Sequence, residues 1–198
     1  VGIITDQARD DGRDLVGASF GAIPELLRFW RRCGLLPVQL GTHRNAASGA
    51  HAAVVLTALS ETGRALLAKA RQQLLPRLCT ALPGPLRRVE PALIAELLHG
   101  LRSSEPPLSA DETRELKAFV HASRSLEAAL PSLHRLARLK LAVTLEQEML
   151  DGDQCAAIIA CVLQHRDRAE FQDGLPTSGA ASLRALLRSA ADRLLQSQ

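Results

Sequence analysis

Residues 14–58 constrain the fold most, because they combine a buried strand, a short helix and two further strands. The apolar run at 14–20 is typical of a strand that is buried on both faces. The runs at 35–40 and 51–56 are rich in Leu and Val, and both are too short to be helices. A polar loop at 41–49 separates these two runs. The stretch therefore predicts the element order β-α-β-β and an α+β fold class.

The helix of this stretch is expected to begin at Pro24, where the missing N–H has no consequence, and to end at Gly34. The apolar residues that we expect on its buried side are Leu26, Leu27, Phe29, Trp30 and Cys33. Aromatic rings can also stack on a nucleotide base. Phe29 and Trp30 lie on the apolar side of the helix, however, so we interpret both as core residues.

Three charged residues of the same helix, Glu25, Arg28 and Arg32, follow one another at spacings of three and four and share one face. From the residues alone, two interpretations are open. Either the face is solvated and holds an intrahelical ion pair, or it contacts an anionic ligand through Arg32, whose guanidinium suits phosphate.

The sequence here resembles the end of the acetyltransferase domain in bacterial tRNA(Met) cytidine acetyltransferases. The resemblance rests on SFGAIPELLRFWRRCG at 19–34, on LGTHRNAASG at 40–49 and on the Val-rich strand that follows. A string of this length is far more specific than a short glycine motif. The resemblance is strong over residues 14–63 and continues more weakly, in the same order, to the C-terminus.

Members of that family place N4-acetylcytidine in the anticodon of elongator tRNA(Met). They combine an N-terminal domain, a RecA-like ATPase module, a GNAT acetyltransferase domain and a C-terminal tRNA-binding tail. The resemblance therefore implies that residues 1–63 are the C-terminal half of a GNAT domain and that residues 64–198 are a helical tRNA-binding tail. It also implies a cytoplasmic enzyme that uses acetyl-CoA and tRNA, with ATP and Mg²⁺ bound by a module outside this sequence.

The chain starts on Val1 and not on Met, and we expect it to be a fragment that begins inside the acetyltransferase domain. We interpret residues 1–4 as the end of an element and 6–13 as a polar loop that leads into the first strand. A GNAT domain holds acetyl-CoA in the split of its sheet, and the glycine-rich turn that binds the pyrophosphate belongs to the missing part. We therefore expect the fragment alone to bind acetyl-CoA poorly and to be inactive.

The resemblance also implies roles for individual residues. Glu25 and Arg32 match positions that contact acetyl-CoA, with Arg32 directed to a phosphate and Glu25 to the adenine, ribose or pantetheine. His43 and Arg44 in the polar loop are expected either to contact tRNA or to belong to an ordinary hairpin connection. No catalytic base is assigned, because no carboxylate at a recognisable spacing orients His43.

Three residues depart from the family pattern. Ile23 stands where a small capping residue such as Thr is expected, Asn45 replaces an expected Glu, and Ala50 replaces an expected Cys. These differences weaken a catalytic role for the polar residues of the loop. They leave the fold prediction unchanged.

Beyond residue 58 the sequence becomes helical. A helix with Ser60 as its N-cap is expected to end or kink at Pro76, and we place the domain boundary near Gly63. Basic residues outnumber acidic ones in and after this helix, which predicts either a phosphate-facing surface or an ordinary solvated face. The candidate RNA-contacting residues of this section are Arg64, Lys69, Arg71, Arg77, Arg87 and Arg88.

The rest of the tail reads as amphipathic helices without a catalytic constellation. One helix is expected to start at a capping box formed by Ser109 and Glu112. The other helices are expected at 91–101, 125–141, 154–164 and 183–195.

Composition narrows the function classes. Of the 198 residues, 46% are apolar and 3% are aromatic, which indicates an interior filled by Leu and Ala and favours helices. The net charge of +3 does not by itself indicate nucleic-acid binding. The four cysteines form no CxxC pair, so neither a metal site nor a disulfide framework is expected, and no run is long enough to span a membrane.

Two other function classes stay open. The first is a GNAT enzyme that acetylates a protein or a small amine and uses its tail for dimerisation. The second is a non-enzymatic helical interaction module in which the strands have lost their catalytic setting.

Overall fold

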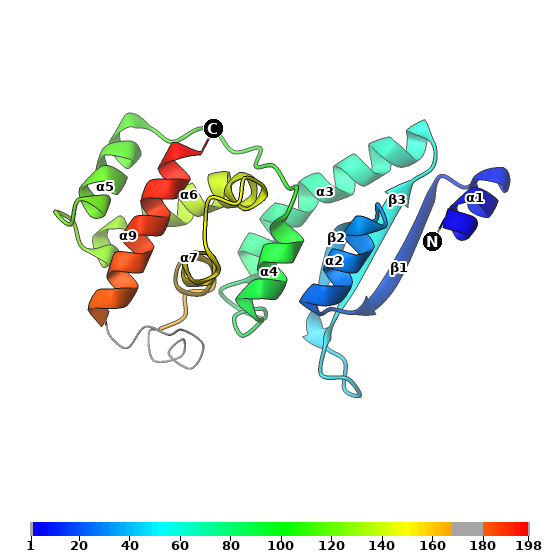
Figure 1. Ribbon diagram of the computed structural model, residues 1–198, viewed down its shortest axis with the longest axis horizontal. Helices are drawn as coiled ribbons and strands as arrows, with labels where there is room; N and C mark the ends of the chain where they lie inside the picture. Colours follow the sequence, from blue (N-terminus) through cyan, green and yellow to red (C-terminus); the bar gives the residue numbers. More distant parts are fainter. Residues whose placement is uncertain (1, 168–179, 198) are drawn as a thin grey trace. The chain divides into compact units, whose positions relative to one another are not determined.

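The chain forms two compact units, Val1–Leu78 and Cys79–Gln198, which we call unit 1 and unit 2 (Figure 1). The computed structural model describes residues 2–167 and 180–197. Unit 1 is a small sheet with helices, and the described part of unit 2 contains helices and their connections but no strand. The fold class is therefore α+β, as the sequence predicts.

The N-terminal residues form helix α1, Gly2–Asp10, so the prediction of an element end followed by a polar loop is wrong. The polar residues pair along the helix: Arg9 donates to the Asp6 carboxylate at 3.0 Å, and the Thr5 hydroxyl donates to the Gly2 carbonyl at 2.7 Å. Such pairs at a spacing of three support a helix that lacks a buried side. No residue of α1 is buried, and the helix is followed by Gly12 at φ +67°.

Unit 1 contains a three-stranded sheet in the order β1-β3-β2, with β1 Leu15–Gly21, β2 Leu36–Arg44 and β3 His51–Ala58. The central strand β3 is antiparallel to both neighbours. Strands β1 and β2 therefore run parallel, which requires a crossover connection, and helix α2, Pro24–Arg32, supplies it. The predicted order β-α-β-β is confirmed.

Helix α2 buries only Leu27 completely. Trp30 is half-buried and stacks on Phe20, with ring centroids 6.0 Å apart. Phe29 is 50% exposed and meets the Trp30 ring edge-on at 5.2 Å, so the prediction that it is a core residue is wrong. The helix has only nine residues, and only a narrow part of its surface packs on the sheet. Phe29 lies outside that packed surface.

Helix α3, Glu61–Ala81, begins in a tight junction with the start of β1. The Ser60 hydroxyl accepts a hydrogen bond from the Gly63 N–H at 3.0 Å, which confirms Ser60 as the N-cap, and it also contacts the Asp14 carboxylate. The Asp14 carbonyl accepts from the Leu59 N–H at 2.9 Å. Pro76 does not end the helix, which continues to Ala81.

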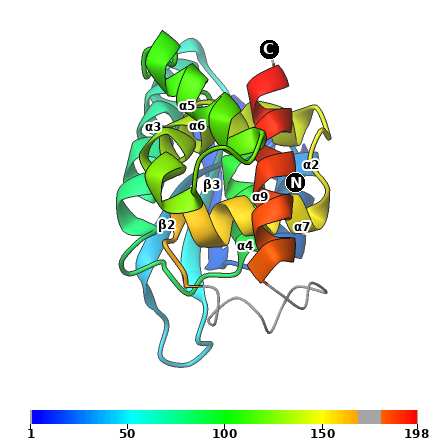
Figure 2. The same ribbon diagram turned by 90° about the vertical axis from the view of Figure 1, so that its left-hand side faces the viewer.

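Unit 2 is built from helices around an apolar core. They are α4 Pro91–Leu98, α5 Ala110–Val120, α6 Leu126–Glu146, α7 Gly152–Ala157, the π-helical segment η1 Ile158–Leu163, and α9 Ala180–Gln196. Helix α9 packs on α5, α6 and α7, and Figure 2 shows it beside α7. Residues at the centre of the packing, such as Phe119, Leu133 and Leu187, are completely buried.

The predicted tail helices are found with shifted ends. The helix expected at 91–101 ends at Leu98, because Gly100 at φ +73° cannot continue it. The helix expected at 154–164 starts two residues earlier as α7 and continues as the π-helical η1. Among the residues that the structure describes, no helix is long and apolar enough to cross a membrane.

The predicted capping box at the start of α5 is present, and Arg135 extends it. The Ser109 hydroxyl accepts from the Glu112 N–H at 3.2 Å, and the Ser109 N–H donates to the Glu112 carboxylate at 2.7 Å. Arg135 of α6 donates to both oxygens of that carboxylate at 2.6 Å. The hydrogen bond from the Ser109 backbone and then the bonds from Arg135 lower the pKa of Glu112 from 4.5 to about 2.

This pKa makes the stability of unit 2 sensitive to acid. A carboxylate with a lowered pKa in the folded state stabilises the fold above its unfolded pKa, and the contribution is lost as the pH falls from 4.5 towards 2. We expect Glu112→Gln to flatten the pH dependence of the urea midpoint in this interval. Equal pH dependence in the wild type and in Glu112→Gln would contradict this assignment.

Candidate functional site

Helix α2 carries the two residues that the family resemblance implies as cofactor contacts. Glu25 lies in the first turn, where a carboxylate is favoured by the helix dipole, and Arg32 is the last residue of the helix. Both side chains are exposed. Arg28 donates to the Glu25 carboxylate at 3.0 Å, so the intrahelical ion pair exists. Ile23 at the N-cap makes no side-chain hydrogen bond, as its departure from the family pattern implies.

A hollow of about 590 Å³ lies in unit 1 beside the second half of α2. Its lining residues are Gly2, Thr5, Arg9, Phe29, Cys33, Thr57, Ala58 and Leu59. Glu25 and Arg32 are not among them. The hollow combines apolar side chains with the guanidinium of Arg9. This hollow could not be predicted from the sequence, because one of its walls is α1, whose residues we expect from the sequence to form a loop.

His43 and Arg44 lie on the last residues of β2, and not in a loop as the sequence predicts. Both side chains are exposed. The turn that follows is closed by Asn45, whose Oδ1 accepts from the N–H groups of Ala47 at 2.9 Å and Ser48 at 3.2 Å. This hydrogen bonding is a reason for Asn in place of the expected Glu, because Asn side chains favour such turns.

His51 is a residue whose role the sequence does not reveal. It is 6% exposed at the start of β3, and its Nδ1 donates to the Gly41 carbonyl at 2.8 Å. Gly41 lies where the pairing of β2 with β3 is irregular, between Leu40 and Arg44. His51 therefore supports the irregular end of β2 from which His43 and Arg44 project.

The candidate RNA-contacting residues divide between the two units. In unit 1, Arg64 is paired with Glu61, Arg77 donates to the Gln73 side chain at 2.8 Å, and Lys69 is exposed. Arg71 donates to the Pro37 carbonyl at 3.2 Å and so links α3 to β2. Arg87 and Arg88 belong to unit 2, in the turn between α3 and α4, and Arg88 is exposed.

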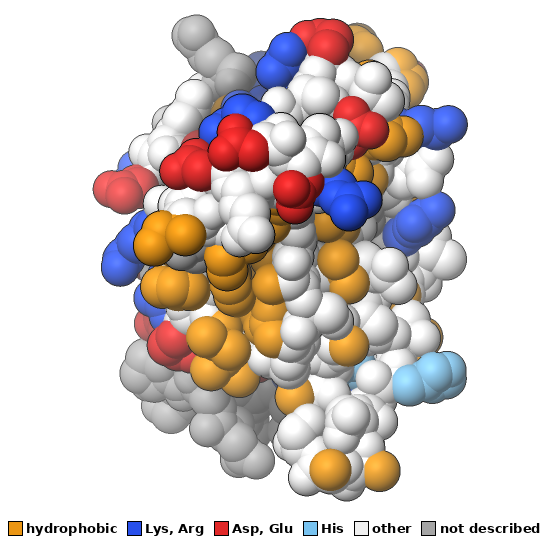
Figure 3. Space-filling view, turned by 90° about the vertical axis from the view of Figure 1, so that its right-hand side faces the viewer, with side chains coloured by type: hydrophobic (Ala, Val, Ile, Leu, Met, Phe, Trp, Pro, Cys, Tyr) orange, Lys and Arg blue, Asp and Glu red, His pale blue; other side chains and the backbone are white. Residues whose placement is uncertain are grey.

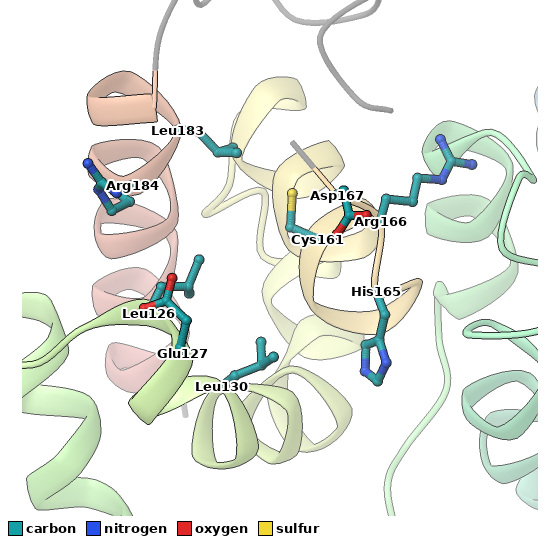
Figure 4. Close-up of a pocket in the computed structure, with 9 residues that line it drawn as sticks. All are labelled: Leu126, Glu127, Leu130, Cys161, His165, Arg166, Asp167, Leu183 and Arg184. Carbon is teal, nitrogen blue, oxygen red and sulfur yellow. The ribbon is translucent and has the colours of Figure 1, made fainter. Parts of the chain in front are cut away.

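Unit 2 contains a pocket of about 430 Å³ between the starts of α6 and α9 and the end of η1 (Figure 4). Leu126, Leu130, Leu183 and Cys161 form its apolar part. Burial raises the pKa of the Cys161 thiol to about 11, so this cysteine is not activated as a nucleophile. The described part of the chain has no group of three or more His, Cys, Asp or Glu residues able to hold a metal ion.

Comparison with known proteins shows which proteins the chain is similar to. Residues 5–60 match the family model for GNAT acetyltransferase 2. The tRNA(Met) cytidine acetyltransferase TmcA of Nitrosococcus halophilus is 38% identical over 189 residues, which is 95% of this chain and 25% of that protein. The enzyme of the same name from Yersinia pestis is 39% identical over 65% of this chain and 18% of that protein. The enzyme of the same name from Pyrococcus furiosus is 30% identical over 85% of this chain and 21% of that protein.

The chain is homologous to the tRNA(Met) cytidine acetyltransferases. It spans about a quarter of the length of the Nitrosococcus halophilus relative. The GNAT match ends at residue 60, where α3 begins, so it contains the whole sheet and α2. The homology to the tRNA(Met) cytidine acetyltransferases extends beyond that match and covers most of unit 2 as well.

Proposed function

We propose that the chain is the C-terminal part of a tRNA(Met) cytidine acetyltransferase, which transfers the acetyl group of acetyl-CoA to N4 of a cytidine in the anticodon of elongator tRNA(Met). The main support is the sheet β1-β3-β2 with its α2 crossover, which falls inside the GNAT match and inside a chain-long homology. ATP and Mg²⁺ belong to a module outside residues 1–198. The free cysteines Cys33, Cys79, Cys155 and Cys161 fit a cytoplasmic enzyme.

Strand β1 supports a cofactor cleft in unit 1. It is an edge strand of the described sheet, with β3 on one side only. The N–H and C=O groups on its other edge are therefore available to a further strand or to the amide groups of pantetheine. Hydrophobic side chains are exposed on the face drawn in Figure 3, below a band of charged ones, which suits a face covered by more protein.

Helix α2 supplies the two proposed cofactor contacts. The exposed guanidinium of Arg32 is suited to a CoA phosphate, since such bonds are charge-assisted and bidentate. Glu25 shares its carboxylate with Arg28, which leaves acceptor capacity for the adenine, the ribose or the pantetheine. Neither role requires a catalytic base from this chain.

We assign the tRNA contacts to cations of both units, of which Arg71 and Arg87 are half-buried and the others are exposed. His43 and Arg44 project from the end of β2, beside the proposed acetyl-transfer region. The remaining proposed contacts are Arg64, Lys69, Arg71, Arg77, Arg87 and Arg88. Affinity for a polyanion comes largely from the counterions that such cations release, which requires no base-specific geometry. Arg71 has a structural role too, because it donates to the Pro37 carbonyl.

The proposed reaction places few chemical demands on these residues. A bond forms between the cytosine N4 and the acetyl carbon, the carbon–sulfur bond of the thioester breaks, and the proton of N4 leaves with the CoA thiolate or through solvent. Because this amine is weakly basic, its placement against the thioester carries the rate enhancement. An extruded base held near the end of β2 would satisfy that demand.

Acceptor specificity tests the proposal. The complete gene product is incubated with isotope-labelled acetyl-CoA, ATP and Mg²⁺, in the presence of tRNA(Met), a lysine-containing protein or a small amine. We expect labelled N4-acetylcytidine in the tRNA after digestion to nucleosides. Transfer to the protein or the amine without transfer to tRNA would refute the proposal and favour another GNAT activity.

A further inference from the structure

Buried apolar side chains and backbone hydrogen bonds fix the course of the turn between α3 and α4 in unit 2. Its apolar residues Leu82, Leu86 and Val89 are buried, while Arg88 is exposed. Within the turn, the Leu86 N–H donates to the Ala81 carbonyl and the Val89 N–H donates to the Leu86 carbonyl, both at 3.0 Å. Residues 82–90, which we call the basic turn, thus have a fixed course that exposes an arginine.

A second segment, distant in sequence, binds the carbonyl groups of the basic turn. The Gln164 Nε2 donates to the carbonyls of Leu86 at 3.1 Å and Val89 at 2.8 Å. Arg166 donates from Nε to the Arg87 carbonyl at 2.5 Å and from Nη2 to the Val89 carbonyl at 2.7 Å. Four hydrogen bonds from two side chains therefore clamp three carbonyls of one short turn.

The backbone of residues 158–166, which carries Gln164 and Arg166, has an unusual conformation. The segment leaves the π-helical η1 through His165 at φ +51°, a conformation that non-glycine residues rarely adopt. π-helical segments and such strained residues are frequent at functional positions. In Figure 4 the guanidinium of Arg166 points away from the pocket that its neighbours line.

The Gln164 side chain indicates that the clamp is more than packing. Gln164 is completely buried, and its Oε1 has no hydrogen-bond partner. A buried acceptor without a partner lowers the stability of a fold, so a leucine of similar size would serve better if this position only filled space. The amide is explained by the two bonds that it donates to the turn.

We propose that Gln164 and Arg166 are positioning residues that hold the basic turn so that Arg88 meets a phosphate of the tRNA backbone. This inference rests on the proposed function and deepens its tRNA contact. A cation on a fixed turn loses less conformational freedom on binding than one on a mobile loop. The guanidinium of Arg166 also covers the carbonyl dipoles of the turn, which would otherwise oppose an incoming phosphate.

The first test compares arginines by their effect on tRNA binding. The complete gene product and its variants are titrated with tRNA(Met) at several salt concentrations. We expect Arg88→Ala to weaken binding roughly fivefold to tenfold and to reduce the slope of log affinity against log salt by about one. The matched control is Arg114→Ala, because Arg114 is an exposed arginine of unit 2 that pairs with Asp111 at 2.7 Å. This control is expected to leave both quantities unchanged.

The second test separates positioning from charge. Arg166→Lys keeps the positive charge but cannot reproduce the forked donation to two carbonyls. We expect it to weaken tRNA binding nearly as much as Arg88→Ala, with little further loss in the double variant. Gln164→Leu is expected to act in the same way at an unchanged melting temperature.

The outcomes distinguish a failure of the proposed function from a failure of the positioning role of Gln164 and Arg166. Salt-independent or absent tRNA binding by the wild type would overturn the proposed function itself. Normal tRNA binding with loss in Arg88→Ala but none in Arg166→Lys and Gln164→Leu would overturn only the positioning role. Fully additive losses in the Arg88→Ala, Arg166→Lys double variant would overturn it as well, because the two residues would then act separately.

Discussion

Replacing Gly63 with alanine is expected to lower the free energy of unfolding of unit 1 by about 2 kcal/mol or more, the usual range for an overpacked site. A Cβ at this position would lie 2.0 Å from the carbonyl oxygen of Asp14 and 2.9 Å from its carbonyl carbon. Both atoms are backbone, so neither can move without shifting β1 or α3. The same shift would disturb the bond from the Gly63 N–H to Ser60.

The measurement is thermal unfolding of the protein, with hydrogen exchange read separately in β1 and α3. Gly152→Ala is the matched control, since nothing lies within 4 Å of a Cβ there and the residue starts α7. We expect faster exchange in β1 and α3 for Gly63→Ala only. Equal exchange in both variants would show that the junction of β1 with α3 is not packed as described.

Replacing Arg32 with alanine is expected to raise the KM for acetyl-CoA of the complete protein about 10- to 100-fold, because hydrogen bonds to charged groups contribute roughly 1.5–3 kcal/mol. The effect should fall on KM more than on kcat, since a phosphate far from the thioester is bound equally in the ground and transition states. Acetyl transfer to tRNA at varied acetyl-CoA concentration gives both constants.

Arg28→Ala provides the comparison within the same helix. Arg28 pairs with Glu25 across one turn, and an exposed pair of this kind contributes only a few tenths of a kcal/mol. We therefore expect its KM to change by no more than about threefold. Similar KM values for Arg28→Ala and Arg32→Ala would contradict a specific contact between Arg32 and a CoA phosphate. Arg32 would then contribute only through its positive charge.

The sheet of unit 1 could be predicted because its strands are short, apolar and closely spaced. Helix α1 could not, because no residue of it is buried and its polar pairs resemble a loop. The prediction for Phe29 is wrong for a related reason, since the apolar side of this nine-residue helix is wider than the part of it that contacts the sheet. The local sequence therefore predicts the strands of unit 1 better than it predicts which side chains of its helices are buried.

The capping box at the start of α5 shows what local sequence can predict, since Ser109 and Glu112 are three residues apart and bond to one another. The clamp on the basic turn shows the opposite case. Gln164 and Leu86 are 78 residues apart, and neither a π-helical segment nor a left-handed His165 has a sequence signature. Glu25 and Arg32 are proposed through the family resemblance, and their exposure in α2 leaves them accessible to the proposed cofactor.

The most direct measurement of the central claim is the N4-acetylcytidine content of elongator tRNA(Met) in cells that lack the gene. We predict that the modified nucleoside disappears on deletion, returns with the complete wild-type gene, and returns only weakly with the Arg32→Ala gene. Unchanged N4-acetylcytidine after deletion would contradict the assignment of this chain to a tRNA cytidine acetyltransferase.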